Sequence, residues 1–173
     1  VIYQNAIAVA PNTEPVEGLA LSPNAVAEQS LRPMADLKCA LIFEPGRALV
    51  ATCGVLITRV LYIKHSGGKR FVVVDASMSD LIRPSLYNAH HQIVPVHLQQ
   101  REREKCEIVG PVCESGDFFA KERELERVER GELLAIMTAG AYGYSLSSNY
   151  NARPRPAEVI VEGKSFKISR PRQ

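Results

Sequence analysis

Short apolar runs separated by turn-forming residues dominate the chain from residue 54 onward. Residues 54–64 and 70–75 are rich in valine and isoleucine, and Gly67-Gly68 lies between them. Because two β-type runs around a Gly-Gly pair are typical of a hairpin, this pattern predicts two paired strands. Further runs with strand character follow at 93–98, 107–112, 133–137, 157–161 and 165–169. Many short strands between turns predict a mainly β fold, an antiparallel β-barrel or sandwich.

Helical character is limited. Residues 80–87 favour one short helical turn, and residues 139–149 favour another that opens at Thr138 as an N-cap. The charged run at residues 121–132 contains very few apolar residues. This run is therefore predicted to be a solvated loop or a short exposed helix.

The N-terminal part of the chain has a different character. Residues 1–37 carry several prolines and keep no period of 3.6 or 2, so they are expected to form an irregular leader or a remnant of a larger unit. Residues 41–43 form a short apolar run that ends at Glu44-Pro45-Gly46-Arg47, which suits a buried strand running into a turn. A complete TIM barrel needs about 250 residues. The chain has 173 residues and so does not contain one.

Composition and charge narrow the classes of function. The chain is 46% hydrophobic and 23% charged, as expected of a soluble globular domain, and its net charge of +2 gives no basis for binding nucleic acid or an anionic membrane. The longest apolar stretch, residues 54–63, is about half of a membrane span. The four cysteines form no CxxC pair, so no metal site is expected and the thiols are expected to be free in a reducing cytoplasm.

Two segments carry residues suited to chemistry. Residues 113–117 (Cys-Glu-Ser-Gly-Asp) place a thiol, two carboxylates and a glycine together, and the same segment also suits a polar turn after a strand. Residues 140–144 surround an aromatic side chain with small residues, which lets the backbone approach a ligand closely. That segment equally suits simple helix packing, so neither motif by itself identifies a function.

The order of the motifs carries more information. Glu44-Pro45-Gly46-Arg47 is followed by blocks at 74–76, 82–87, 109–117 and 139–143, and the series closes on Ser148-Asn149-Tyr150-Asn151. This series resembles the diaminopimelate decarboxylases, which depend on pyridoxal 5'-phosphate (PLP) and have an alanine racemase-like fold. The resemblance runs from about residue 37 to the C-terminus. It implies a C-terminal β-barrel domain at residues 54–173, preceded at 38–53 by the end of a TIM barrel whose last strand lies near 41–47.

The resemblance implies a cofactor-binding role for three residues. Gly46 and Arg47 would lie beside the phosphate of PLP, at the end of the last barrel strand. Tyr142 looks like the family tyrosine that meets the phosphate and lies against the cofactor.

The same resemblance implies roles in substrate binding and catalysis. Arg47, Arg83 and Tyr87 are similar to substrate-binding residues. Cys113 and Glu114 resemble a pair that is delivered across a dimer interface into the neighbouring subunit's site. Diaminopimelate ends in a carboxylate and an ammonium, and Arg83 suits the first while Glu114 suits the second. Cys113 is expected to supply the proton after carbon dioxide leaves.

The chain also departs from the family. None of its lysines lies in a tract resembling Tyr-Ala-x-Lys-Ala-Asn, where the family holds PLP, and the histidine that stacks on the cofactor is missing too. One interpretation is the C-terminal part of a decarboxylase that converts meso-diaminopimelate to L-lysine and carbon dioxide as a homodimer. A second is a non-catalytic relative that pairs with a full-length subunit. A third is a decarboxylase for another basic amino acid.

Overall fold

The computed structural model describes residues 6–9, 24, 28, 31–34, 42, 44 and 46–173. The chain divides into two compact units, residues 14–45 and the remainder. The 3-10 helix η1 (Arg32–Met34) belongs to the first unit. All elements described below belong to the second.

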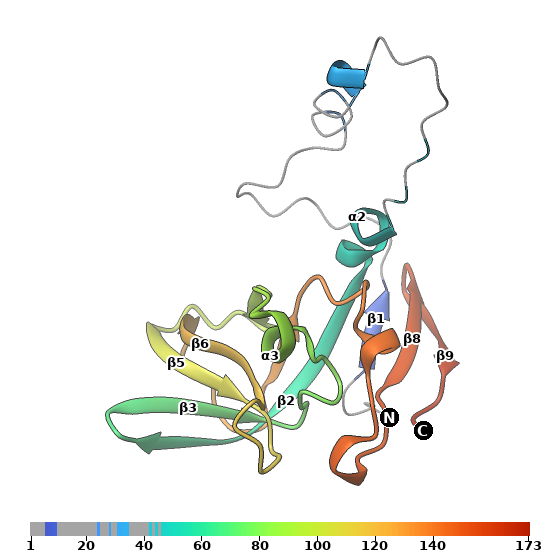
Figure 1. The fold of residues 1–173 in the computed structure, drawn as a ribbon. Coiled ribbons are helices and arrows are strands. Elements are labelled where there is room, and N and C mark those ends of the chain that lie inside the picture. The colour runs from blue at the N-terminus through green and yellow to red at the C-terminus, as the bar shows by residue number, and fades with distance from the viewer. Residues whose placement is uncertain are drawn as a thin grey trace. The chain divides into compact units, whose positions relative to one another are not determined.

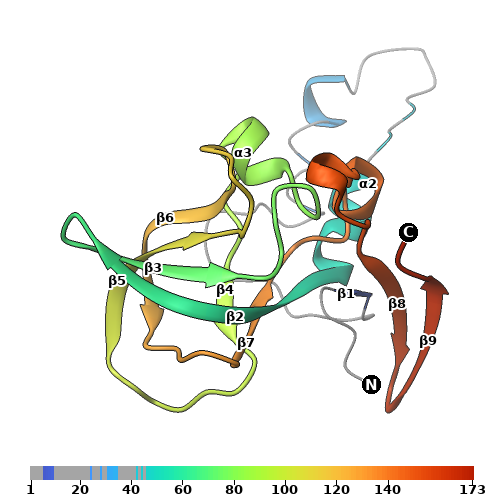
Figure 2. The same cartoon turned by 90° about the horizontal axis from the view of Figure 1, so that it is seen from below.

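Six strands form a nearly closed barrel, which can be followed in Figures 1 and 2. They are β2 (Gly54–Ser66), β3 (Lys69–Val74), β4 (Ile93–Pro95), β5 (Arg103–Val109), β6 (Phe118–Glu126) and β7 (Leu133–Ile136). The paired neighbours run β6-β5-β3-β2, and β2 also pairs with β7, which pairs with β4. Because β4 lies beside β6, the ladder curves into a nearly closed barrel. The predicted mainly β barrel is therefore confirmed.

The barrel is mixed rather than wholly antiparallel. β3 and β5 run parallel, with Val72 opposite Ile108, while the remaining barrel pairs are antiparallel. Parallel neighbours need a crossover connection instead of a tight turn. Here the crossover passes through the short helix α3 (Arg83–Tyr87) and strand β4. The helix predicted within residues 80–87 thus lies in the connection that the parallel pair requires.

Three strands extend the ladder beyond the barrel. β1 (Ala6–Val9) pairs antiparallel with β2 and parallel with β8 (Ala157–Glu162). β8 and β9 (Ser165–Arg170) form a hairpin, as predicted, with Gly163 in its turn at φ 58°. This hairpin lies on the side away from β5 and β6 (Figures 1 and 2).

The predicted hairpin at residues 54–75 is also confirmed. β2 and β3 pair from Ser66 and Lys69 onward, and the turn residues Gly67 and Gly68 have φ of 57° and 75°. Glycine adopts this left-handed backbone conformation without steric cost. The pair of glycines therefore fixes where the long β2–β3 ribbon reverses.

An aliphatic core fills the barrel. Its largest fully buried side chains are Phe119, Leu56, Leu81, Ile108, Leu125, Leu134, Ile136, Val60, Val72 and Val74. Burying one such side chain contributes roughly 1.5–3 kcal/mol to folding. The barrel is thus a packed scaffold, and ligand sites are to be sought at its ends and on its connections.

The prediction for residues 121–132 is wrong in its first half, because β6 continues to Glu126. Two glutamates of β6 lie opposite basic residues of β5. Arg103 lies opposite Glu126, and Lys105 lies opposite Glu124. Opposite charges across a ladder stabilise the pairing. Residues 121–126 are therefore part of a strand because they pair with β5.

The predicted helix at residues 139–149 is wrong as well. Its described secondary structure is limited to the 3-10 helix η3 (Tyr144–Leu146), and Thr138 has φ 61° rather than an N-cap conformation. The backbone amides of Ala139 and Gly140 instead donate to carbonyl oxygens at Gly54 and Ala51, at 2.8 and 3.0 Å. These long-range hydrogen bonds tie the start of the segment to residues 51–54, and the segment forms turns.

The last TIM-barrel strand predicted near residues 41–47 lies partly outside the described residues. Ile42 and Glu44 have no regular secondary structure, and Gly46 and Arg47 open the short helix α2 (Gly46–Val50). The 3-10 helix η2 (Ala51–Cys53) then leads into β2. No helix in the described part of the chain is long and apolar enough to cross a membrane.

Candidate active site

One cavity of about 610 Å³ gathers most of the site residues that the sequence predicts. Its lining residues are Arg47, Arg83, Tyr87, Ala89, Tyr142 and Leu146. They come from α2, from α3 and its C-terminal flank, and from the turns that follow β7. Two guanidinium groups and two phenols, far apart in sequence, thus share one hollow.

A close approach of two glycines brings these segments together. A Cβ added to Gly54 would overlap the backbone of Gly140, and one added to Gly140 would overlap the carbonyl oxygen of Val50. The backbone on either side can therefore pass at this distance only because both residues lack a side chain. This contact fixes the turn before Tyr142 against the end of the helix that carries Arg47.

Tyr142 is held in an uncommon backbone conformation. Its φ is 61°, in the left-handed region that residues with a Cβ rarely adopt. Its side chain is half exposed, and the Arg83 guanidinium carbon lies 5.9 Å from the centre of its ring. That distance is within the range of a cation–π interaction. Such outliers are often found at functional sites.

Helix α3 presents Arg83 and Tyr87 from one turn. Pro84 lies in its first turn, where its missing N–H costs nothing, and Asn88 closes the helix at φ 50°. Arg83 Nε is buried, and no residue in the described part of the chain accepts a hydrogen bond from it. Arg83 Nε is therefore not anchored by an acceptor among the described residues.

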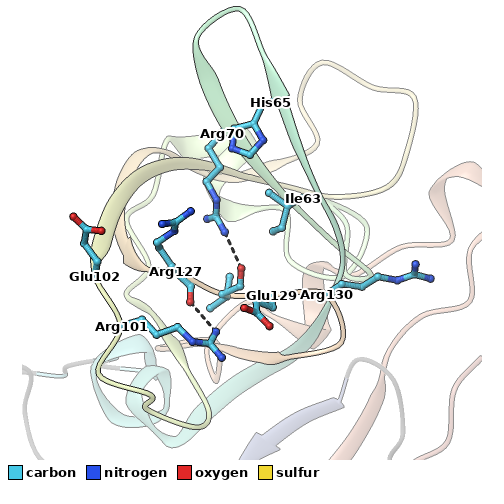
Figure 3. A pocket seen from close by; sticks show the side chains of 9 residues that line it. Ile63, His65, Arg70, Arg101, Glu102, Arg127, Glu129 and Arg130 are labelled. Atoms are coloured by element: carbon cyan, nitrogen blue, oxygen red, sulfur yellow. Dashed lines mark hydrogen bonds between the residues drawn. The ribbon is translucent and has the colours of Figure 1, made fainter.

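A second hollow, of about 660 Å³, opens at the barrel end formed by β2, β3 and the loops beside β5 and β6. Figure 3 shows Arg70 and Arg101 pointing into it. Arg70 donates to the carbonyl oxygen of Val128 at 2.7 Å and pairs with Glu104, while Arg101 forms two hydrogen bonds to Glu132. These arginines close the barrel end by binding acceptors of the same chain, so this hollow is not the favoured site.

The loop between β5 and β6 is organised by the buried carboxylate of Asp117. Its two oxygens accept the backbone amides of Met78 and Val112, at 2.7 and 2.9 Å. Burial raises the pKa of the Asp117 carboxyl, and these two hydrogen bonds act in the opposite direction. A Cβ at Gly110 would overlap the same carboxylate. The motif Gly-Pro-Val-Cys-Glu-Ser-Gly-Asp therefore builds a defined loop.

Cys113 and Glu114 lie on this loop with exposed side chains. One Glu114 oxygen accepts the Gly116 amide at 3.3 Å, and the other accepts the Tyr150 hydroxyl at 3.0 Å. These bonds lower the pKa of the Glu114 carboxyl, the Gly116 amide most strongly. Glu114 is therefore expected to be charged at neutral pH.

The structure does not bring Cys113 and Glu114 into the cavity lined by Arg83. The loop is tied to α3 through the Ser85 hydroxyl, which donates to the carbonyl oxygen of Gly116. A Cβ at Gly116 would press on the same Ser85 hydroxyl. The predicted site residues thus form two groups on one domain, a cavity group and an exposed loop group.

The comparison with protein families identifies the family of the chain. Residues 3–140 match the family described as pyridoxal-dependent decarboxylase, C-terminal sheet domain. The chain belongs to this family. The sheet domain comprises the nearly closed barrel and the hairpin described above, and the resemblance to diaminopimelate decarboxylases is confirmed.

Individual relatives agree with the family match. The chain is 49% identical over 152 residues to the diaminopimelate decarboxylase of Aquifex aeolicus, covering 88% of this chain and 36% of that protein. It is 50% identical over 133 residues to the enzyme of Vibrio cholerae, covering 77% and 32%. The chain therefore spans about a third of the length of these relatives.

The fold agrees with a solved relative as well. The diaminopimelate decarboxylase of Helicobacter pylori, crystallised with L-lysine, superposes with a TM-score of 0.80 at 42% sequence identity. The superposition covers 91% of this chain and 39% of the Helicobacter protein. The structural similarity thus extends over nearly all of this chain.

The cavity fits part of the cofactor that the family name implies. PLP has a phosphate at one end, and Arg47 and Tyr142 offer a cation and a hydroxyl for it. Gly46 has open space where a side chain would stand, which leaves room for a ligand beside the backbone. No lysine lines the cavity among the residues that the structure describes. The residues present therefore fit the phosphate end of PLP and not its aldehyde.

Sequence reasoning missed the residues that support the site. Asp117, Ser85 and Tyr150 received no role, although each lies inside one of the recognised blocks. The signal was their position within those blocks. The contacts of Asp117 with Met78, of Ser85 with Gly116 and of Tyr150 with Glu114 join residues 31 to 39 positions apart, so only the fold reveals them.

Proposed function

We propose that this chain is the C-terminal part of a diaminopimelate decarboxylase, which converts meso-diaminopimelate to L-lysine and carbon dioxide. The observation that carries this proposal is the single cavity that collects Arg47, Arg83, Tyr87 and Tyr142. The bound L-lysine in the Helicobacter relative supports it, because L-lysine is the product of that reaction. We assign residues 38–53 to the end of a TIM barrel and residues 54–173 to the sheet domain.

The proposed mode of substrate binding follows from the charges at the distal end of diaminopimelate. Arg83 and Arg47 can each hold a carboxylate through two parallel hydrogen bonds. Tyr87 adds a hydroxyl at the same cavity wall. Glu114 carries the negative charge that answers the distal ammonium. Ornithine and lysine lack the distal carboxylate, so the two arginines favour diaminopimelate.

The cofactor role belongs to Gly46, Arg47 and Tyr142, which we propose hold the phosphate of PLP. The chemistry that PLP supplies when bound is an electron sink for the pair left behind by carbon dioxide. The ring of Tyr142 lies beside Arg83, so the cofactor-binding and substrate-binding groups share one wall of the cavity. This arrangement positions the substrate relative to the phosphate.

Cys113 is the proposed proton donor. After carbon dioxide leaves, the α carbon needs a proton, and the exposed Cys113 thiol can deliver one from Sγ. Because Cys113 and Glu114 lie outside the cavity of their own domain, we propose that they serve the site of a partner subunit. A homodimer, or pairing with a full-length subunit, then completes each site.

Mixed dimers test this function directly. The full chain is combined with a full-length diaminopimelate decarboxylase whose cysteine corresponding to Cys113 is replaced by alanine, and carbon dioxide release from meso-diaminopimelate is measured. The expected result is restored turnover with the wild-type chain and with Cys53→Ala, which removes a half-buried thiol elsewhere. Cys113→Ala is expected to restore none. Equal turnover with Cys113→Ala and Cys53→Ala would contradict the assignment.

A non-catalytic sheet-domain relative remains the second candidate, because no lysine lines the cavity among the described residues. Size-exclusion chromatography of the same mixture separates the two readings. Dimers that form without restored turnover indicate the non-catalytic relative. Dimers whose turnover depends on Cys113 indicate the decarboxylase.

A further inference from the structure

The closing block of the sequence, residues 148–151, has no role in the function proposed so far. It runs into the 3-10 helix η4 (Tyr150–Ala152), whose last two residues, Asn151 and Ala152, have φ of 58° and 54°. Two consecutive residues in the left-handed region are costly for side chains with a Cβ. The chain accepts this conformation at the point where it turns Tyr150 toward the β5–β6 loop.

The surroundings fix this turn. Ser148 N–H donates to the carbonyl oxygen of Ser79 at 2.9 Å, and Arg153 donates to that of Asp75 at 2.6 Å. The same segment, residues 75–80, holds the β5–β6 loop through the bond from Met78 N–H to Asp117. The block that carries Tyr150 and the loop that carries Glu114 therefore share one anchor.

We propose that Tyr150 is a positioning residue for Glu114, fixing its carboxylate in the orientation that receives the distal ammonium of the substrate. The Tyr150 hydroxyl donates to one Glu114 oxygen at 3.0 Å, and the Gly116 amide donates to the other at 3.3 Å. Each carboxylate oxygen has a second lone pair for an incoming donor. This inference rests on the proposed function, since it names the support for a substrate-binding side chain.

The chemistry of a phenol suits this task. Tyr150 is a neutral donor, so it orients the carboxylate without cancelling the negative charge that the ammonium needs. The contact raises the pKa of the Tyr150 hydroxyl and helps to lower that of Glu114, which keeps the proton on the phenol. An arginine or a lysine at this position would compete with the substrate for Glu114.

Titration of the full chain tests the contact without any turnover. Carboxyl carbon-13 NMR follows the Glu114 signal, assigned by its loss in Glu114→Gln, in the wild-type chain, in Tyr150→Phe and in Tyr62→Phe. Tyr62 is an exposed tyrosine on β2 and serves as the matched control. The pKa of Glu114 is expected to rise in Tyr150→Phe and to stay unchanged in Tyr62→Phe. An unchanged Glu114 titration in Tyr150→Phe overturns the proposal.

The mixed dimers test the consequence for the substrate. Tyr150→Phe is expected to raise KM for diaminopimelate roughly fivefold while kcat stays within about twofold, because one charge-assisted hydrogen bond is lost. In a Glu114→Gln background the same substitution is expected to leave KM unchanged. A KM increase of equal size in both backgrounds, or none in either, overturns the positioning role. If the wild-type chain restores no turnover, the proposed function fails while the Glu114 titration still decides the contact.

Discussion

Glycine residues allow the backbone segments of the candidate site to pack closely. Gly54 and Gly140 let two backbone segments meet, and Gly110 leaves the space that the Asp117 carboxylate fills. In each case the neighbour that excludes a Cβ is backbone or a buried carboxylate rather than a flexible side-chain tip. Substitution at such positions therefore disturbs the segments that carry Tyr142, Cys113 and Glu114.

Gly110→Ala is expected to lower the free energy of unfolding by roughly 2–3 kcal/mol. The added methyl group displaces the Asp117 carboxylate from the backbone amides of Met78 and Val112. Gly46→Ala, where open space surrounds the new methyl group, is the control and is expected to change the free energy by less than about 0.5 kcal/mol. Urea unfolding measures both, and equal midpoints would show that the Gly110 contact carries no energetic weight.

His91 is expected to make the stability of the barrel depend on pH. It is almost fully buried, its Nδ1–H donates to the carbonyl oxygen of Met137 at 2.8 Å, and burial lowers its pKa below 6.5. Between that lowered pKa and about 6.5 the unfolded chain binds more protons than the folded chain. The free energy of unfolding is therefore expected to fall as pH falls below about 6.5.

Urea unfolding between about pH 5 and pH 7 checks this dependence. His91→Gln is expected to remove part of the slope, while the exposed His97→Gln is expected to keep it. A slope that is the same in all three proteins would mean that His91 is not its source.

At the scale of elements, local chemistry predicted some segments and not others. The hairpin of β2 and β3 was predictable because Gly67 and Gly68 specify the reversal within the segment itself. Strand β6 was not, because the charges opposite it lie on β5. The turns at residues 139–149 were not, because Gly140 bonds to Ala51, which is remote in sequence.

The link between α3 and the β5–β6 loop is also an element-scale contact, and Ser85→Ala tests it. Loss of the hydroxyl that donates to Gly116 is expected to speed amide hydrogen exchange at Gly110 and Asp117, whose bonds close the loop, by roughly tenfold. Ser165→Ala, in the β8–β9 turn, is expected to leave these two amides unchanged. Equal protection in Ser85→Ala and in the wild-type chain would show that α3 does not restrain the loop.

At the scale of the whole molecule, the domain carries two groups of candidate site residues, one that lines a cavity and one on an exposed loop. The order of the motifs predicts the members of both groups as candidates, and the structure joins four residues of the first group in one cavity. It leaves Cys113 and Glu114 on an exposed loop. Spacing along the chain could not predict that Arg83 and Cys113 belong to different groups. Their positions depend on the parallel pairing of β3 with β5 and on the crossover between them, which are long-range features of the fold.

The most direct test of the central claim is the choice of substrate in a reconstituted enzyme. The full chain is co-expressed with the part of the Aquifex relative that this chain does not match, and carbon dioxide release is measured with meso-diaminopimelate and with ornithine. Turnover of diaminopimelate is expected to exceed that of ornithine at least about a hundredfold, and Arg83→Gln is expected to remove most of this preference. Equal turnover of the two amino acids by the wild-type assembly would contradict the assignment.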